Sequence, residues 1–535
     1  MSERPTDESA APPADPPATP PPAAPSSPPP YAPPAVPTAV PRSAPLKPVS
    51  RSIASVGVAL TVSFAILAMG AGYWQVFQSE DLSTAPDNPA VLAAARNVVR
   101  GEIVDRHGTV LAMNKTDKNG EPYRLYLDRA ISPVVGYASR RYGTAGLERT
   151  YSAALTGLND PDPVRNLLKK FQSDPYDPQT LTLSLSDELQ RAAVRGLGND
   201  RGAVVMLDPR TGEVLALAST PVYDASAIAN PATQDAGFAA VRDNKAQPLL
   251  TRPTQGRYVP GSVFKIVTAV AGLGSGRVGP DTTFENQAKA EKDGLVVNGF
   301  RIREHAGVPA RTLNLVGATE VSSNVWFALA GLQTGGDKLA EYAAKMGFGS
   351  SLPFDLPTAP SQVTNGDGGG PGGFADDTEL ANASYGQAET FVTPLQMALV
   401  AATVANDGDL MRPHLVTAMT GEQGTRTIEP QSMNRVISPA DANAITAAMV
   451  QAVEGDVGRQ FTTGAAVKGI TTAGKSGTAE LGGSGEPHSW FIGFAPAENP
   501  QIAIAVLVER GGRGGERAAP LAGSLMTTYF KLFGG

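Results

Sequence analysis

The chain of 535 residues contains no cysteine, and this excludes disulfide scaffolds, cysteine nucleophiles and thiolate metal sites. Histidine is scarce, with only His107, His305, His414 and His488, which disfavours a multi-histidine metal site. A basic surplus is also lacking, because 44 Lys and Arg face 51 Asp and Glu, for a net charge of −7. Since a nucleic-acid-binding domain normally carries a basic face, this balance disfavours a nucleic-acid partner.

Proline is abundant but unevenly placed. Eighteen of the 46 prolines fall in residues 1–50, where Tyr31 is the only aromatic residue. Such a segment has little to bury, so residues 1–51 are predicted to form a disordered Pro/Ala-rich tail with polyproline II character. The tail is interpreted either as a plain solvated segment, which is favoured, or as a docking ligand for a proline-binding partner.

A charge-free stretch from Ser52 to Ser79 follows the tail. A bilayer core needs about 20 apolar helical residues, so residues 52–77 are predicted to be a transmembrane helix, with Tyr73 and Trp74 in an aromatic belt. Basic residues precede it and acidic residues follow it: Arg42, Lys47 and Arg51, then Glu80 and Asp81. This asymmetry predicts a single-pass cell-membrane protein with a cytoplasmic N-terminus and an extracytoplasmic remainder.

Two other interpretations of this stretch are disfavoured. A signal peptide cleaved near residues 68–70 would have an n-region of about fifty residues, far longer than usual. A buried globular helix would need covering chain, and nothing before the stretch could cover it.

The rest of the chain predicts two units, residues 80–185 and residues 186–535. The first is mixed, with short hydrophobic runs and loops. In the second, residues 203–218 predict two strands around a turn, and residues 502–508 predict another strand. Between and after them come apolar helical stretches: Ser262–Leu273, Leu313–Leu332, Pro394–Ala405, Ala442–Val453 and Leu521–Phe533. Strands at both ends of a helical middle predict an α+β fold whose sheet joins distant strands.

The first chemical motif is residues 260–265, Pro-Gly-Ser-Val-Phe-Lys. On a helix, Ser262 and Lys265 share one face, with about 4.5 Å of rise between them. Serine is a weak nucleophile until a base takes its proton. Lys265 could be that base if its pKa fell from about 10.4 to near 7, a change of roughly 4 kcal/mol that burial and a second cation would supply. A capping serine is the simpler interpretation of this motif alone.

Two further motifs are Ser322-Ser-Asn324 and Lys475-Ser-Gly-Thr478. At a break between helices, a hydroxyl and an amide two residues apart could relay a proton and hold a substrate amide. Lys475 could supply the second cation or bind a carboxylate, and Gly477 would let a peptide lie along the strand. Taken singly, the first of these motifs is more simply interpreted as a polar kink or cap, and the second as an ordinary polar turn.

Residues 469–476 also match the phosphate-binding pattern G-x-x-x-x-G-K-[ST]. That loop requires a buried strand before it and a helix after it. The flanking residues 459–468 and 481–487 predict neither element, and the predicted topology places the segment away from any ATP pool. The nucleotide interpretation is therefore rejected.

Together and in this order, the three motifs resemble those of penicillin-binding proteins and serine β-lactamases. Residues 100–108 resemble the start of the class B pedestal domain, and residues 136–137 and 142–148 resemble the actinobacterial elongation and division-type branch. Further matching segments are 257–265, 386–388, 393–398, 475–480 and 490–494. The resemblance covers about residues 95–535. It implies an antiparallel sheet with helices on both faces, an all-helical subdomain, and an elongated mixed pedestal over residues 80–185.

The resemblance implies a role for each motif residue. Ser262 would attack the penultimate carbonyl of a D-Ala-D-Ala stem peptide, Lys265 would take its proton, and Ser322, tuned by Lys475, would protonate the departing D-alanine. Asn324 would hold the acyl side chain, while Ser476, Gly477 and Thr478 would line the carboxylate end. An amine of a second stem peptide would then form the cross-link, and β-lactam antibiotics would acylate the same serine. No metal and no organic cofactor is implied.

The subclass follows from what accompanies the motifs. No E-x-x-L-N occurs, so the deacylating glutamate of class A β-lactamases has no counterpart. The stretch before the catalytic unit is too short for a glycosyltransferase domain, which indicates a monofunctional class B enzyme. The resemblance to such enzymes implies a multi-pass membrane glycosyltransferase as its partner. Ser476 and Ala388 stand where threonine and glycine are common in the family.

Three other functions stay open. A D,D-carboxypeptidase or esterase of the same fold would use water as the acceptor. A β-lactam sensor would need a cytoplasmic effector domain. A non-catalytic scaffold would not need intact motifs. A triad hydrolase is disfavoured, because no G-x-S-x-G surrounds Ser262. His305, His488 and the charged residues of 102–106 are interpreted as ordinary loop and turn residues.

Overall fold

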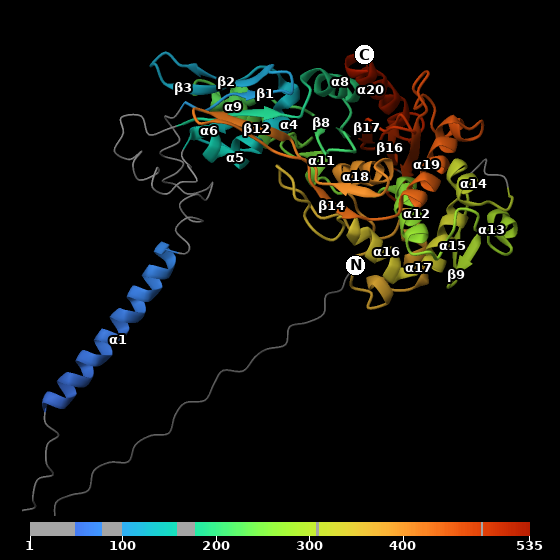
Figure 1. Cartoon of the computed structure of the whole chain (residues 1–535), viewed down its shortest axis with the longest axis horizontal. Helices are drawn as coiled ribbons and strands as arrows, with labels where there is room; N and C mark the ends of the chain where they lie inside the picture. Colours follow the sequence, from blue (N-terminus) through green and yellow to red (C-terminus); the bar gives the residue numbers. More distant parts are fainter. Residues whose placement is uncertain (1–48, 77–98, 158–176, 306–309, 483–484, 535) are drawn as a thin grey trace, which may run out of the picture. The chain divides into compact units, whose positions relative to one another are not determined.

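The computed structural model describes residues 49–76, 99–157, 177–305, 310–482 and 485–534. The chain divides into two units, residues 1–77 and residues 78–535. The first contains α1 (Val49–Val76), drawn in blue in Figure 1, whose side chains are described for residues 54–70. Within the described part of the chain, none of the helices meets the length and apolarity that a membrane span requires. The predicted transmembrane helix over 52–77 therefore stays a prediction, and the predicted tail lies outside the described residues except where α1 begins.

A five-stranded antiparallel sheet forms the centre of the second unit. Its strand order is β15 (Ala473–Ala479), β16 (His488–Ala495), β17 (Ile502–Val508), β7 (Gly202–Leu207) and β8 (Val214–Thr220). The strands β17 and β7 lie far apart in the chain, yet they pair with Ile504 opposite Met206. This sheet confirms the predicted α+β fold with strands from both ends of the domain.

Helices cover both faces of this sheet (Figure 1). Because successive strand residues point to opposite faces, Val204 and Met206 join one core while Val205 and Leu207 join the other. The first face is covered by α8 (Asp187–Leu197) and α20 (Ala518–Phe533). The second is covered by α18 (Pro394–Ala405) and α19 (Pro439–Glu454), with α12 (Lys265–Gly274) packed beside them. Every residue of α18 is buried, as expected of a helix that is apolar almost all round.

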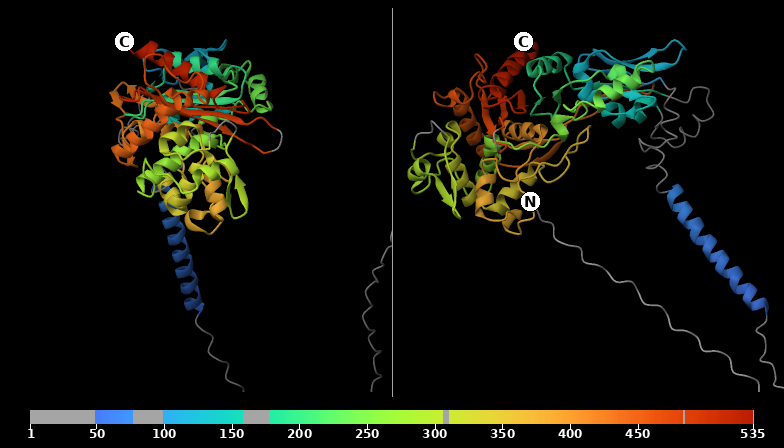
Figure 2. Two further views of the ribbon diagram at one scale, coloured as in Figure 1. Left: turned by 90° about the vertical axis from the view of Figure 1, so that its right-hand side faces the viewer. Right: turned by 180° about the vertical axis from the view of Figure 1, so that it is seen from behind.

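A mostly helical subdomain lies between α12 and α18 in the chain. Figure 2 shows its green and yellow helices gathered apart from the red and orange strands of the sheet. Its elements are α13 (Gln287–Asp293), β9 (Leu295–Val297), β10 (Phe300–Ile302), α14 (Leu315–Glu320), α15 (Asn324–Thr334), α16 (Gly336–Lys345) and α17 (Asp377–Ala383). The subdomain expected to be all-helical thus also holds the β9–β10 hairpin. The stretch expected as Leu313–Leu332 is two helices, broken at residues 321–323, where Ser322 has a φ of 56°.

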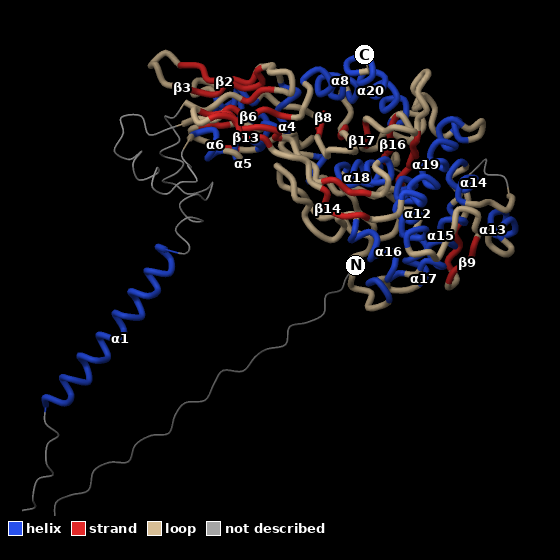
Figure 3. Tube along the Cα trace, in the orientation of Figure 1, coloured by secondary structure: helices blue, strands red, loops and turns tan. Residues whose placement is uncertain are grey.

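A second sheet of six strands forms the pedestal (Figure 3). Its order is β13 (Gly424–Thr427), β12 (Val416–Gly421), β6 (Thr180–Leu183), β1 (Ile103–Val104), β2 (Val110–Thr116) and β3 (Pro122–Tyr126). The β12–β13 hairpin comes from the later part of the chain, with Met419 opposite Leu181. The predicted contiguous units did not anticipate this addition, which supplies β6 with a hydrogen-bonding partner on its second edge.

Shorter elements complete the described chain. They are η1 (Arg129–Ile131), α4 (Ser132–Val135), β4 (Ala138–Ser139), β5 (Gly143–Thr144), α5 (Gly146–Thr150), α6 (Ser152–Thr156), α9 (Ala225–Ala229), α10 (Gln234–Arg242), α11 (Arg252–Gln255), η2 (Gly261–Phe264), η3 (Pro371–Gly373), β11 (Asp409–Met411), β14 (Ser432–Arg435) and η4 (Gly458–Gln460).

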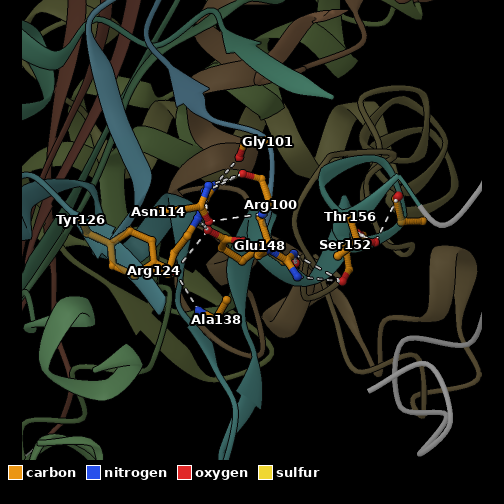
Figure 4. A network of polar contacts seen from close by, with 10 residues as sticks. Arg100, Gly101, Asn114, Arg124, Tyr126, Ala138, Glu148, Ser152 and Thr156 are labelled. Atoms are coloured by element: carbon orange, nitrogen blue, oxygen red, sulfur yellow. Dashed lines mark hydrogen bonds and ion pairs between the residues drawn. The ribbon is translucent and has the colours of Figure 1, made fainter. Parts of the chain in front are cut away.

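A buried ion cluster holds the pedestal together (Figure 4). Glu148 on α5 is fully buried and pairs with Arg100 at 2.7 Å and with Arg124 at 2.5 Å. Tyr126 donates its hydroxyl hydrogen to the same carboxylate at 3.2 Å. Burial opposes ionisation of Glu148, but the positive charges of Arg124 and Arg100 outweigh it and lower the pKa of this carboxyl. The cluster thereby joins α5 to β3 and to the segment around Arg100 that precedes β1.

Candidate active site

The predicted nucleophile lies in a tight turn. Ser262 belongs to the 3-10 helix η2, and Lys265 begins α12 directly after it. The expected single α-helix therefore starts with a 3-10 turn, in which side chains three residues apart eclipse one another. The turn aligns Lys265 with Ser262 more closely than an α-helix would. Ser262 is half-buried, whereas Lys265 is fully buried.

Two glycines let the backbone close around this turn. Gly261 has a φ of 56°, and a Cβ there would lie 2.6 Å from the carbonyl oxygen of Thr478. Gly386 has a φ of 87°, and a Cβ there would clash with the carbonyl oxygen of Gly261. Gly261 also donates its backbone N–H to the Gly386 carbonyl at 2.9 Å. The turn that carries Ser262 therefore packs closely between β15 and the loop at residues 385–388.

The Lys265 side chain joins the first motif to the second. Its Nζ donates to the Ser322 carbonyl at 2.7 Å and to Asn324 Oδ1 at 2.9 Å, and it lies 3.2 Å from Ser322 Oγ. Both carbonyl oxygens are obligate acceptors, so they take the two N–H groups of a neutral amine. The remaining lone pair is then free to accept a proton from a hydroxyl, which is the arrangement a general base needs.

Burial and charge favour the neutral amine. Burial is the larger cause that lowers the pKa of Lys265 well below its usual range; the positive charge of Lys475 adds to it, and the Glu304 carboxylate opposes it. Lys475 is itself buried, and burial lowers its pKa to about 7. From the sequence, a lowered pKa of Lys265 is expected to result from burial and a second cation. In the structure, burial is the larger of these two causes.

The third motif occupies β15, at the edge of the central sheet. A Cβ at Gly477 would lie 3.0 Å from the Pro260 carbonyl, so glycine allows this strand to approach the nucleophile turn. Ser476 is buried, and Lys475 donates from Nζ to its carbonyl at 3.0 Å. Thr478 is exposed and its Oγ1 accepts from the Gly514 N–H at 3.2 Å, which leaves its hydroxyl hydrogen free for a carboxylate. Because the motif is a strand, the phosphate-loop interpretation lacks the helix that it needs.

Sequence reasoning missed Glu304, which follows β10. Its carboxylate accepts the backbone N–H groups of Asn324 and Val325, both at 2.9 Å, and the Ser323 hydroxyl at 2.6 Å. No local pattern marks this residue, because its partners lie about twenty positions later in the chain. Within the described ranges, no group of three histidine, aspartate or glutamate side chains could hold a metal ion.

The remaining flagged residues have structural partners. Asp105 Oδ1 accepts the backbone N–H groups of His107 and Thr109, which forms the turn that the sequence indicates. His488 begins β16, and its Nδ1 accepts from the Arg510 N–H at 3.1 Å.

Comparisons with known proteins agree with this site and fold. The family described as the penicillin binding protein transpeptidase domain matches residues 202–527, and the penicillin binding protein A dimerisation domain matches residues 100–178. The peptidoglycan D,D-transpeptidase PbpA of Mycolicibacterium smegmatis is 35% identical over 88% of this chain and 97% of its own. Its counterpart from Mycobacterium tuberculosis is 33% identical over the same shares.

Solved structures lead to the same family. Penicillin-binding protein A from M. tuberculosis as its penicillin G acyl-enzyme complex has a TM-score of 0.71 and 32% identity, over 81% of this chain and 100% of that one. The ceftriaxone acyl-enzyme complex of the same protein has a TM-score of 0.72 and 31% identity, over 81% of this chain and 98% of that one. The chain described here therefore belongs to the penicillin-binding proteins, as a class B D,D-transpeptidase of the actinobacterial type.

Proposed function

We propose that this chain joins two peptidoglycan stem peptides through an ester on Ser262. The observation that carries the proposal is the buried Lys265 amine, held by Ser322 and Asn324 one 3-10 turn after Ser262. A neutral amine close to a serine can take that serine's proton, so the arrangement supports acyl transfer. The acyl-enzyme complexes of the M. tuberculosis relative support the same chemistry.

The reaction has two halves. Ser262 Oγ bonds to the carbonyl carbon of the penultimate D-alanine while Lys265 takes the hydroxyl proton. The bond to the terminal D-alanine breaks, and Ser322 passes that proton to the departing amine. An amine of a second stem peptide then attacks the ester, forms the cross-link and returns the hydrogen to Ser262. With a β-lactam the broken amide belongs to a ring, so the leaving amine stays tethered and the ester persists.

The substrate is held by the second and third motifs. Asn324 binds the acyl side chain, and Ser476 with Thr478 binds the terminal carboxylate next to the backbone of Gly477. The backbone N–H groups of Ser262 and Thr478 form the oxyanion hole, and removing such a donor typically costs about 3–4 kcal/mol of transition-state stabilisation.

The decisive test uses the full chain in detergent micelles with a fluorescent penicillin, followed by a denaturing gel and intact mass. We expect a stable one-to-one adduct on the wild type and none on Ser262→Ala. Ser275→Ala, at the C-terminal end of the following helix α12, is the matched control and should label like the wild type. Rapid consumption of the drug without an adduct would indicate a β-lactamase, and a folded but unlabelled wild type would indicate a scaffold.

A second assay identifies the acceptor. The protein is incubated with a D-alanyl-D-alanine peptide and a free D-amino acid, and the products are identified by mass spectrometry. Exchange of the terminal residue supports transfer to an amine. Release of D-alanine with only the free acid left would instead identify a D,D-carboxypeptidase.

The chain is anchored in the cell membrane by a single pass through α1, with the catalytic unit outside. The support for this proposal comes from the sequence, because about 20 apolar helical residues suffice to cross a hydrocarbon core of about 30 Å. Residues 52–79 carry no charge, and the described side chains of α1 that are large and apolar are exposed. Protease added to right-side-out vesicles should digest the catalytic unit but spare the tail, whereas release by alkaline carbonate would contradict anchoring.

The same helix offers a contact surface to a multi-pass glycosyltransferase, which supplies the glycan strands that a monofunctional transpeptidase cross-links. Its apolar side chains, such as Phe64 and Leu67, point outward along the described part of α1. We expect the full chain to co-purify with such a partner in mild detergent. Replacing α1 by an unrelated membrane helix should abolish co-purification while penicillin labelling stays intact.

A further inference from the structure

The carboxylate of Glu304 lies beneath the second motif at the start of α15. It accepts three hydrogen bonds, from the Ser323 hydroxyl at 2.6 Å and from the backbone N–H groups of Asn324 and Val325 at 2.9 Å each. The first-turn N–H groups of a helix have no partner within the helix, and a carboxylate there is further stabilised by the helix dipole. Glu304 thus fixes the backbone of Asn324 at the first residue of α15.

The residue before it fixes the Asn324 side chain. The Asn324 amide donates from Nδ2 to the Arg303 carbonyl at 3.0 Å. A carbonyl oxygen only accepts, so this contact settles which side of the amide carries the oxygen. The amide oxygen Oδ1 is thereby turned toward Lys265, whose Nζ donates to it at 2.9 Å. Arg303 and Glu304 together hold both the main chain and the side chain of Asn324.

Glu304 also acts on Lys265 through its charge. Burial lowers the pKa of Lys265 most, and the positive charge of Lys475 lowers it further. The Glu304 carboxylate acts in the opposite direction and raises this pKa. Glu291 belongs to the same cluster, where it accepts from Gln287 Nε2 at 2.8 Å and lies 3.4 Å from Ser323 Oγ. The backbone N–H groups of Asn324 and Val325 donate to Glu304 and not to Glu291, so the two carboxylates have different structural roles.

We propose that Glu304 is a positioning residue that holds Asn324 against Lys265 and counterbalances the cationic environment of that lysine. The proposal rests on the acylation chemistry argued above. Positioning groups of this kind influence rate strongly, because a displacement of about 1 Å can cost roughly 10²-fold. Removing the carboxylate should also shift the protonation of the base, which a purely structural support would leave alone.

The test compares the acylation rate of the full chain by fluorescent penicillin across pH for the wild type, Glu304→Gln and Glu304→Asp. We expect Glu304→Gln to acylate about 10- to 100-fold more slowly. Since the carboxylate raises the pKa of Lys265, its loss should move the midpoint of the pH–rate curve to lower pH. Glu304→Asp keeps the charge on a shorter side chain, so it should lose rate while its midpoint stays near that of the wild type.

Glu291→Gln is the matched control, since it neutralises the neighbouring carboxylate in the same cluster; its midpoint should equal that of the wild type. An unmoved midpoint in a folded Glu304→Gln variant, whatever its rate, would overturn the proposal. Should that variant fail to fold, Glu304→Asp decides, because an unchanged acylation rate there would overturn the proposal too. Failure of the acylation chemistry itself is distinct, because the wild type would then not label at any pH.

Discussion

The Lys265 Nζ donates a hydrogen bond of 2.7 Å to the backbone carbonyl of Ser322, a residue 57 positions later in the chain. Ser322 has a φ of 56°, a left-handed conformation that non-glycine residues rarely adopt. In this conformation both its carbonyl and its hydroxyl face the same amine. Backbone strain of this kind persists only where the surrounding structure enforces it, and it clusters at functional sites.

Replacing Lys265 by methionine should separate activity from stability. Methionine keeps most of the volume but has no base, so we expect penicillin acylation to fall by about 10² to 10⁴-fold. The melting temperature should change little, because removing a buried amine relieves a desolvation cost but leaves the acceptors of Ser322 and Asn324 without their donor. Stopped-flow labelling and a thermal melt measure the two effects. Lys468→Met, at an exposed position, serves as the control, and a Lys265→Met variant that labels at the wild-type rate would contradict the assigned base.

Two substitutions at Ser322 separate its hydroxyl from its backbone. Ser322→Ala and Ser322→Gly both remove the hydroxyl, so both should slow acylation by the stem peptide, the half-reaction in which Ser322 protonates the departing D-alanine. Only glycine relieves the left-handed conformation, which costs a non-glycine residue about 1–3 kcal/mol. Ser322→Gly should therefore unfold at a higher denaturant concentration than Ser322→Ala. The reverse order in chemical denaturation would show that the conformation is not strained.

The buried lysines should make stability rise with pH. The folded pKa of Lys475 is about 7, against an ordinary value of 10.5, so between these values the unfolded chain holds a proton that the folded chain lacks. Raising the pH then favours the folded state, by up to about 1.4 kcal/mol per pH unit for this one group. The free energy of unfolding of the wild type minus that of Lys475→Met should therefore increase from about pH 7 to pH 9. A flat or falling difference would contradict the lowered pKa.

The pedestal should depend on Glu148. Glu148→Gln would leave the buried guanidinium groups of Arg100 and Arg124 without a counter-charge, and breaking a buried ion cluster in this way costs about 3–5 kcal/mol. We expect a lower denaturation midpoint, observed by circular dichroism. Glu341→Gln on α16 is the matched control, since Glu341 is exposed and its ion pairs with Lys338 and Lys345 lie at the surface, and it should leave the midpoint unchanged. Equal midpoints for the two variants would show that the cluster is not needed for stability.

Acid should weaken the same cluster. The pKa of Glu148 lies below its ordinary value of 4.5, because the two arginines outweigh the effect of its burial. A lowered carboxyl pKa contributes stability above the ordinary value and loses it as the pH falls through the folded value. The wild type should therefore lose its advantage over Glu148→Gln as the pH drops below about 4.5. An advantage that persists at the lowest pH would contradict the ionised pairing.

The sequence by itself determined the residues that bear the chemistry and the elements whose signal is local. The apolar run Pro394–Ala405 is α18, and the run Ile502–Val508 is β17, with the expected bounds. Their period and their caps lie within the segment itself, so neighbouring residues suffice to predict them. The order of the three motifs likewise identified the family, because it is a property of the sequence alone.

Only the tertiary structure decided which groups meet. The acceptors of Lys265, the carboxylate of Glu304 under α15 and the β12–β13 hairpin in the pedestal sheet all depend on contacts between distant parts of the chain. No local periodicity encodes such a contact, since it arises only when packing brings the elements together. The close packing around the 3-10 turn at Ser262 is of the same kind, because the backbone of Thr478 leaves room for glycine alone at residue 261, and the backbone of Gly261 does the same at residue 386.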